Sequence, residues 1–180
     1  RATVAALSDL AAVAAEPLAL VSALAVPGGW RDALHDLTDG IGAAAERYHT
    51  PIVGGNVTRG AKLSLTITVL GTVKRALPRS GVRAGDTLYV TGELGASGAA
   101  LDALYAGRVP SPAQRERFAR PVPRIAAARW LAAHGATAAI DISDGLLAEL
   151  AHLAAASGVR VELDAASVPL APGVERERAL

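Results

Sequence analysis

The hydrophobic positions at the start of the chain predict two amphipathic helices separated by a strand. Val4, Leu7, Ala11 and Ala14 recur at helical spacing and form the apolar face of the first helix, which Pro17 ends. Residues 18–26 then form a strand-like apolar run that stops at a Pro-Gly-Gly turn. The apolar face of the second helix consists of Leu34, Leu37, Ile41, Ala44, Ala45 and Tyr48.

Residues 63–69 have the clearest strand pattern, because apolar and polar residues alternate with period two. A shorter strand is predicted at Ile52–Val53, and the glycine-rich stretch 54–60 is predicted to be the loop between the two strands. A sheet with one buried face needs a layer of helices on that face. The order of elements therefore predicts a two-layer domain in residues 1–74.

A polar turn that begins at Pro78 separates this domain from a second predicted domain, residues 79–180. Its apolar segments alternate between strand-like and helical patterns, which predicts a mixed α+β (α/β) architecture. Strands are predicted at residues 88–90, 138–142 and 159–163. Helices are predicted through Leu101 and Leu104, from Pro123 onward, and from Leu146 to a stop at Gly158.

Composition narrows the class of protein. Of the 180 residues, 51% are hydrophobic and 3% are aromatic, so the chain can bury a core of Ala, Val and Leu but offers no platform for base stacking. The net charge of +1 gives no electrostatic drive toward nucleic acid. The longest apolar run, residues 18–26, is too short to cross a membrane, and the absence of cysteine is typical of a cytoplasmic protein. The chain starts at Arg1 without any methionine, which indicates a fragment.

The run from Asp141 to Leu146 carries the strongest chemical signal, because two carboxylates and a hydroxyl lie where a strand-like segment meets a helix. Ser143 or Asp144 would serve as a helix N-cap, which is a purely structural use of these residues. Asp141 cannot cap the same helix and is costly there without a cation or a hydrogen-bond donor. Two carboxylates three positions apart therefore predict a site for a hard cation.

Residues 54–60 and Arg79 form weaker candidates for phosphate or metal binding. The glycines let the backbone approach an anion closely, Asn56 offers a neutral oxygen and Arg59 a guanidinium, but a plain turn would need only the glycines. Taken by themselves, most arginines in a position such as that of Arg79 are merely solvated, and an aspartate such as Asp9 is more often a surface charge than a ligand. The glycine-rich turn 92–98 lacks the P-loop pattern, and the four histidines show no metal-ligand spacing. Scattered acidic and glycine-rich segments favour metal-assisted phosphate chemistry over histidine catalysis.

The combination of these segments is more specific than any one of them. They are Leu7-Ser8-Asp9-Leu10-Ala11-Ala12, Val53-Gly54-Gly55-Asn56-Val57-Thr58-Arg59-Gly60, Arg79-Ser80-Gly81, Gly85-Asp86 and Asp141-Ile142-Ser143-Asp144-Gly145-Leu146. In this order they resemble the thiamine-monophosphate kinases, of the aminoimidazole ribonucleotide synthetase-like superfamily of ATP-binding enzymes. The resemblance implies a two-domain fold of which this chain holds part of each domain. It also implies a homodimer formed through the N-terminal sheet, to which residues 63–69 would belong.

The same resemblance implies Mg²⁺-dependent transfer of a phosphoryl group from ATP to thiamine monophosphate, giving thiamine diphosphate. No residue is expected to form a covalent intermediate. By similarity the magnesium ligands would be Asp9, Asn56, Asp141 and Asp144. By similarity the nucleotide contacts would be Gly55, Asn56, Arg79 and Ser143.

The chain departs from the family pattern at two positions, with Asn56 where the family has Asp and Ala6 where it has Asn. An amide in place of a carboxylate removes one negative charge from the metal site. The family's Gly-Asp-Asp loop, its Thr-Asp segment and its Gly-Gly-Glu-Asp-Tyr substrate loop are absent, so residues 1–180 alone are expected to be inactive. Two other functions stay open: an amidoligase of the same superfamily, and an inactive nucleotide-binding dimerisation module.

Overall fold

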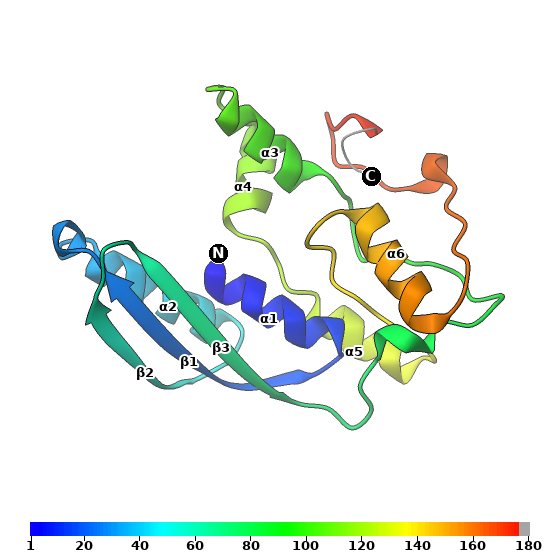
Figure 1. Ribbon diagram of the computed structural model, residues 1–180, viewed down its shortest axis with the longest axis horizontal. Coiled ribbons are helices and arrows are strands. Elements are labelled where there is room, and N and C mark those ends of the chain that lie inside the picture. Colours follow the sequence, from blue (N-terminus) through cyan, green and yellow to red (C-terminus); the bar gives the residue numbers. More distant parts are fainter. Residues whose placement is uncertain (177–180) are drawn as a thin grey trace.

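The computed structural model describes residues 1–176 as helices packed on and beside one small sheet (Figure 1). The first half contains α1 (Ala2–Ala12), β1 (Glu16–Val26), α2 (Leu34–Arg47), β2 (Ile52–Arg59) and β3 (Ser64–Thr72). The second half contains α3 (Ala96–Tyr105), α4 (Pro112–Ala119), α5 (Ile125–Ala133) and α6 (Leu146–Ser157). Short 3-10 turns lie at Gly28–Trp30, Arg79–Gly81 and Ala165–Ser167. No helix within residues 1–176 combines the length and apolar character that a membrane crossing requires.

The sheet has the strand order β2-β1-β3. β1 pairs with β2 in parallel, so α2 serves as the crossover between them, and β1 pairs with β3 antiparallel. Leu20, in the middle of β1, stands opposite Ile52 of β2 and Val69 of β3. The predicted strands at 18–26 and 63–69 are therefore confirmed, with boundaries shifted by a few residues.

Helices cover one face of the sheet, as the alternation of residues predicted. Leu20, Leu24 and Val26 of β1 are buried against Ile41 and Ala45 of α2. The alternating apolar residues of β3 pack on the same cluster: Leu65, Ile67 and Val69. The polar positions between them are exposed on the other face. This two-layer unit is the predicted N-terminal architecture; its predicted boundary at residue 74 stays a prediction.

The glycine-rich stretch predicted as a loop lies mostly in a strand, so that prediction was wrong. Residues 54–59 belong to β2 and pair with residues 21–26 of β1. Gly55 explains the strand: a Cβ built there would lie 2.1 Å from the carbonyl oxygen of Ser22, and no side chain fits at that distance. The absence of a side chain at Gly55 therefore allows β1 to approach closely, and the predicted contact of Gly55 with the nucleotide stays a prediction.

The second half packs around α6. Leu146, Leu150, Leu153 and Val168 form a buried cluster. The predicted strands at 88–90, 138–142 and 159–163 are not strands within residues 1–176, although Leu94 and Leu170 form an isolated parallel bridge. Their alternation is nevertheless meaningful, because Ala138, Ile140, Val161 and Leu163 all pack on the α6 cluster. Period two predicts which face is apolar, but it does not supply a hydrogen-bonded partner. The last four residues of the predicted domain 79–180 lie outside the described residues.

The structure also has a helix that the sequence analysis missed, α4. Ser111 begins it with a capping box: its hydroxyl accepts from the backbone N–H of Gln114, and the Gln114 side chain accepts from the N–H of Ser111. Pro112 occupies the first helical position. The Ser-Pro-Ala-Gln sequence is a recognised helix-start signal, but no apolar periodicity follows it.

Asp86 bonds the polar turn that begins at Pro78 to the segment around Thr137, and this contact can be tested. Asp86 accepts hydrogen bonds from the Thr137 hydroxyl (2.7 Å) and from the Arg83 N–H (3.0 Å). These bonds, the Thr137 bond foremost, hold the pKa of Asp86 below its usual value. A lowered folded-state pKa contributes stability above the unfolded-state pKa, and this contribution is lost as the pH falls through the folded-state pKa. We therefore expect Thr137→Val to raise the pKa of Asp86 in NMR titrations.

The same substitution should flatten the pH dependence of stability. Urea unfolding of the wild type should weaken more steeply than that of Thr137→Val as the pH falls from about 5 to about 3, the range in which aspartates titrate. Thr87→Val, in the same turn, is the matched control. Parallel pH profiles for wild type and Thr137→Val would contradict the assigned bond.

Candidate functional site

Three charged residues from separate segments lie close together where the two halves of the chain meet. Asp9 comes from α1, Arg79 from the 3-10 turn and Asp141 from the extended segment before α6. Both Asp141 and Arg79 lie near enough to change the pKa of the Asp9 carboxyl. The structure therefore brings together three of the predicted site residues, which are far apart in the sequence.

The connector at residues 77–81 holds these segments in place. The buried Leu77 donates its N–H to the carbonyl of Val13, just after α1, at 3.3 Å. Pro78 accepts from the N–H of Ala139 at 3.3 Å, two residues before Asp141. A Cβ built on Gly81 would lie 1.8 Å from the carbonyl oxygen of Thr137, so only glycine permits this close approach. Backbone contacts thus join the three segments that carry the predicted site residues.

The last turn of α6 fixes Arg79 from the other side. The Ser157 hydroxyl donates to the carbonyl oxygen of Arg79 at 2.9 Å and accepts from the N–H of Val82 at 3.2 Å. Ser157 was assigned no role in the sequence analysis, because a serine next to a helix-ending glycine gives no signal of a long-range contact. One helix therefore bonds to both sides of the turn that carries Arg79.

Burial and two neighbouring charges determine the electrostatics of Asp9. Partial burial raises the pKa of Asp9 first, the negative charge of Asp141 raises it further, and the Arg79 guanidinium lowers it. A hard cation between the two carboxylates would remove their repulsion, so their oxygen donors fit Mg²⁺. Within residues 1–176 no group of three or more His, Cys, Asp or Glu residues is arranged to hold a metal. Asp9 and Asp141 alone would therefore not complete the coordination of Mg²⁺, and further oxygen ligands would have to come from other residues, water or substrate phosphates.

Ser143 and Asp144 do not cap α6 with their side chains, contrary to the structural alternative considered above. Gly145 is the N-cap residue and makes no side-chain cap bond. Glu149, one turn into α6, reaches back instead: its Oε1 accepts from the Ser143 hydroxyl (3.2 Å) and from the Asp144 N–H (3.3 Å). The Asp144 carboxylate is therefore not used in capping, and this residue is exposed.

Glu149 is the site-associated residue that the sequence analysis missed. Its other oxygen, Oε2, lies 3.0 Å from Nδ1 of the half-exposed His152. Hydrogen bonding from His152 is the main cause that lowers the pKa of Glu149, against the opposing effect of burial. A signal was present: Glu149 lies between Leu146, Leu150 and Leu153 on the apolar face of the helix, where an unpartnered carboxylate is costly.

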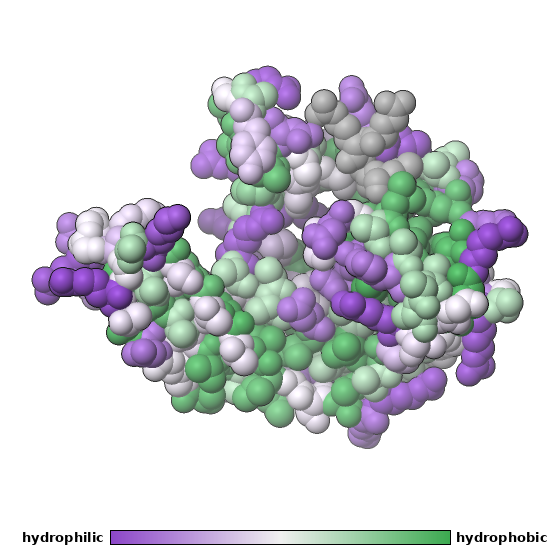
Figure 2. Space-filling view, viewed as in Figure 1, coloured by the Kyte–Doolittle hydropathy of each residue, from purple (hydrophilic) through white to green (hydrophobic). Residues whose placement is uncertain are grey.

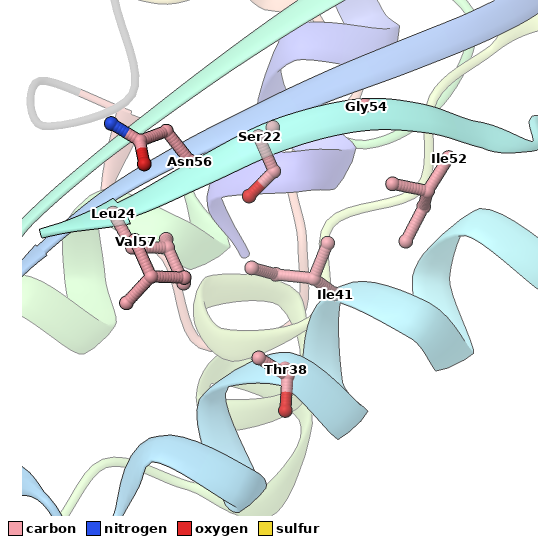
Figure 3. A pocket seen from close by; sticks show the side chains of 9 residues that line it. Ser22, Leu24, Thr38, Ile41, Ile52, Gly54, Asn56 and Val57 are labelled. Atoms are coloured by element: carbon pink, nitrogen blue, oxygen red, sulfur yellow. The ribbon is translucent and has the colours of Figure 1, made fainter.

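Gly55 and Asn56 lie on β2, at the edge of the sheet farthest from β3. They border a shallow hollow of about 320 Å³ between β1, β2 and α2. Figure 3 shows Ile52 and Val57 pointing toward α2, whereas the Asn56 side chain lies on the other side of the strand. The lining contains no charged residue: Ser22, Leu24, Thr38, Ile41, Ile52, Gly54, Gly55, Asn56 and Val57. The hollow is therefore a different place from the Asp9–Arg79–Asp141 group.

The fold and this junction define the class of protein. Residues 1–73 match the family described as AIR synthase related protein, N-terminal domain, and residues 83–178 match AIR synthase related protein, C-terminal domain. The second match alone covers more than half of the chain. The chain belongs to the family of AIR synthase related proteins.

Within this family the chain is similar to thiamine-monophosphate kinases. It is 38% identical to the thiamine-monophosphate kinase of Salmonella typhimurium, over 94% of this chain and 54% of that protein. A solved structure of AaThiL complexed with AMPPCP and TMP has a TM-score of 0.90 at 31% identity, over 97% of this chain and 61% of that one. The thiamine-monophosphate kinase of Stenotrophomonas maltophilia has a TM-score of 0.87 at 38% identity, over 92% and 55% of the two chains. The chain spans about half the length of the curated relatives it matches.

Proposed function

We propose that the full-length protein transfers the γ-phosphoryl group of ATP to thiamine monophosphate, producing thiamine diphosphate and ADP. The proposal is supported by the similarity to thiamine-monophosphate kinases over most of the chain. It is supported further by AaThiL, whose structure was solved with AMPPCP and TMP and whose fold this chain shares. The site itself must supply the chemical argument, because similar folds can carry different reactions.

The observation that carries the proposal is that Asp141 and Arg79 come near enough to Asp9 for their charges to act on its carboxylate. Phosphoryl transfer between phosphates requires that negative charge be neutralised and that the reacting groups be aligned. Two carboxylates would hold Mg²⁺, and a guanidinium would bind phosphate oxygens. This set of groups matches those needs and includes no nucleophile that would form a covalent intermediate.

In the proposed reaction a phosphate oxygen of thiamine monophosphate attacks the γ-phosphorus of ATP. The new P–O bond forms as the bond between the γ-phosphorus and the β,γ-bridging oxygen breaks, and ADP leaves with that electron pair. Mg²⁺, when bound, neutralises charge that develops on the phosphate oxygens. Asp9 and Asp141 would hold the ion, and Arg79 would orient the polyphosphate from the connector turn. The backbone contacts of residues 77–81 join the segments that carry these three groups.

The remaining site residues are assigned by similarity. Asp144 and Asn56 would add oxygen ligands to the metal, and Gly55, Asn56 and Ser143 would contact the nucleotide. Because Asn56 lies on β2 and carries no charge, it would contribute a weaker oxygen ligand than the carboxylate that the family pattern has there. The Ser143 hydroxyl donates to Glu149, which leaves its oxygen lone pairs as acceptors.

We also propose that the protein is a cytoplasmic homodimer that joins through its N-terminal sheet. The uncovered face and rims of the sheet are accessible, and Leu18 on β1 and Leu70 on β3 are each about half exposed. Figure 2 shows apolar surface along the lower side of the molecule, where Figure 1 places the adjoining ends of β1 and β3. Exposed apolar area of this kind is typical of an interaction surface.

The test is product formation by the full-length protein from thiamine monophosphate, ATP and Mg²⁺, with chromatographic separation of thiamine diphosphate and ADP. We expect equal amounts of the two products and loss of both when EDTA removes the metal. ADP without thiamine diphosphate would favour the amidoligase function. ATP binding without any turnover would favour the inactive module.

A further inference from the structure

Glu149 is a carboxylate in an otherwise apolar position of α6. Its side chain is 5% exposed, and its helical neighbours Leu146, Leu150 and Leu153 form the core cluster of the second half. A buried carboxylate is retained at a substantial desolvation cost unless hydrogen bonds satisfy it. Each oxygen of Glu149 has at least one partner, so the structure meets this condition.

The partners of Glu149 are the residues that precede the helix. Oε1 receives hydrogen bonds from both Ser143 and Asp144, one from a hydroxyl and one from a backbone N–H. On the opposite side, Oε2 contacts His152, which fixes the orientation of the carboxylate. Neither Ser143 nor Asp144 caps the helix with its own side chain. The side-chain bonds between this turn and α6 are instead those that Glu149 makes from within the helix.

Hydrogen bonds from backbone N–H groups hold the segment that carries Asp141 and Asp144 on both sides. With its N–H held by Glu149, Asp144 is fixed at its backbone while its own carboxylate takes no part in capping. The adjacent segment is held independently by the bond between Ala139 and Pro78. Two tethers thus flank Asp141: one runs to the connector before it, and one runs to α6 after it.

We propose that Glu149 is a positioning residue that sets the geometry of the Asp141–Asp144 turn for binding a metal–nucleotide complex. This inference rests on the proposed function, in which that turn contacts Mg²⁺ and ATP. Glu149 itself contacts neither ligand, and it acts through the two bonds that it accepts from Ser143 and Asp144. The positioning depends on how far the carboxylate oxygen of Glu149 extends toward Ser143 and Asp144, and not on its negative charge.

Two substitutions in the full-length protein separate reach from charge. Glu149→Asp keeps the charge but withdraws the oxygens by one methylene, whereas Glu149→Gln removes the charge and keeps an acceptor oxygen in place. Glu162→Asp, at an exposed glutamate paired with Arg160, is the matched control. Binding is measured by calorimetric titration of Mg²⁺ with the non-hydrolysable analogue AMPPCP, and steady-state kinetics give KM and kcat separately.

We expect Glu149→Asp to weaken binding of the Mg²⁺–AMPPCP complex and to raise KM for Mg²⁺–ATP by about 10- to 100-fold, the usual effect of losing a group that orients metal ligands. The melting temperature of Glu149→Asp should fall no further than that of Glu149→Gln. Glu149→Gln should bind the analogue nearly as well as the wild type does. Wild-type binding by Glu149→Asp would overturn the inference, and so would equal losses in both variants. Absence of analogue binding by the wild type would overturn it too. Normal analogue binding without thiamine diphosphate formation would instead refute only the proposed function.

Discussion

Asp141→Ala in the full-length protein is expected to lower kcat/KM for thiamine diphosphate formation by about 1000-fold. Loss of a metal ligand removes ~4 kcal/mol of charge stabilisation, and each ~1.4 kcal/mol is a factor of ten in rate. The effect should be large because Asp141 is one of the two carboxylates that the proposed site brings near each other, so the substitution removes a full negative charge that would hold Mg²⁺. Product formation at saturating ATP and varied Mg²⁺ measures it.

A second readout tests the geometry without any turnover. The charge of Asp141 raises the pKa of Asp9, so Asp141→Ala should lower that pKa in NMR titrations of the metal-free protein. Asp39→Ala, at an exposed carboxylate of α2, is the control and should change neither the pKa of Asp9 nor the rate. A fully active Asp141→Ala protein would exclude Asp141 as a metal ligand.

Leu20→Ala is expected to destabilise the protein by about 2–5 kcal/mol, the usual cost of removing a fully buried leucine side chain. Leu20 is completely buried at the centre of β1, where it packs with residues of α2 and β3. Urea unfolding followed by circular dichroism measures the change in the free energy of unfolding. The same substitution at Leu18, which is 55% exposed on the same strand, should cost about 0.5 kcal/mol or less. Equal effects at the two positions would contradict the assigned packing of β1.

Sequence periodicity predicted α1, β1, α2 and β3 well because each of these elements packs one face on its neighbours. It failed for most of β2, which is exposed along its whole length. The strand at 63–69 alternates strictly, and its apolar residues pack on the cluster around Leu20. In the second half, residues 138–142 and 159–163 also alternate, and Ala138, Ile140, Val161 and Leu163 pack on the α6 cluster. They are not strands within residues 1–176, because pairing depends on a partner that the local sequence does not specify.

The candidate site was predicted only in part, because its residues come from segments that are far apart in the sequence. Asp141 was found from its own sequence neighbours, whereas the approach of Asp9 and Arg79 to it depends on backbone bonds between distant segments. Family resemblance, and not periodicity, selected those two residues. For Gly55 nothing in the sequence indicated that the close approach of β1 also requires a glycine, because strand pairing is not visible in the local sequence. Glu149 was missed because the leucines around it were enough to predict the helix, and the one carboxylate on the same apolar face was not considered.

The connector between the two halves has a consequence for chimeric proteins. Residues 77–81 bond to Val13, just after α1, on one side. On the other side they bond to Ala139 and lie close to Thr137, so they contact both halves. An N-terminal half taken from another family member would bring its own Asp9 equivalent, but it would meet a connector fitted to a different α1. Such exchanges would preserve each hydrophobic cluster and still misalign the carboxylates. We therefore expect the fit at residues 77–81, and not only the two hydrophobic clusters, to decide whether such a chimera aligns its site.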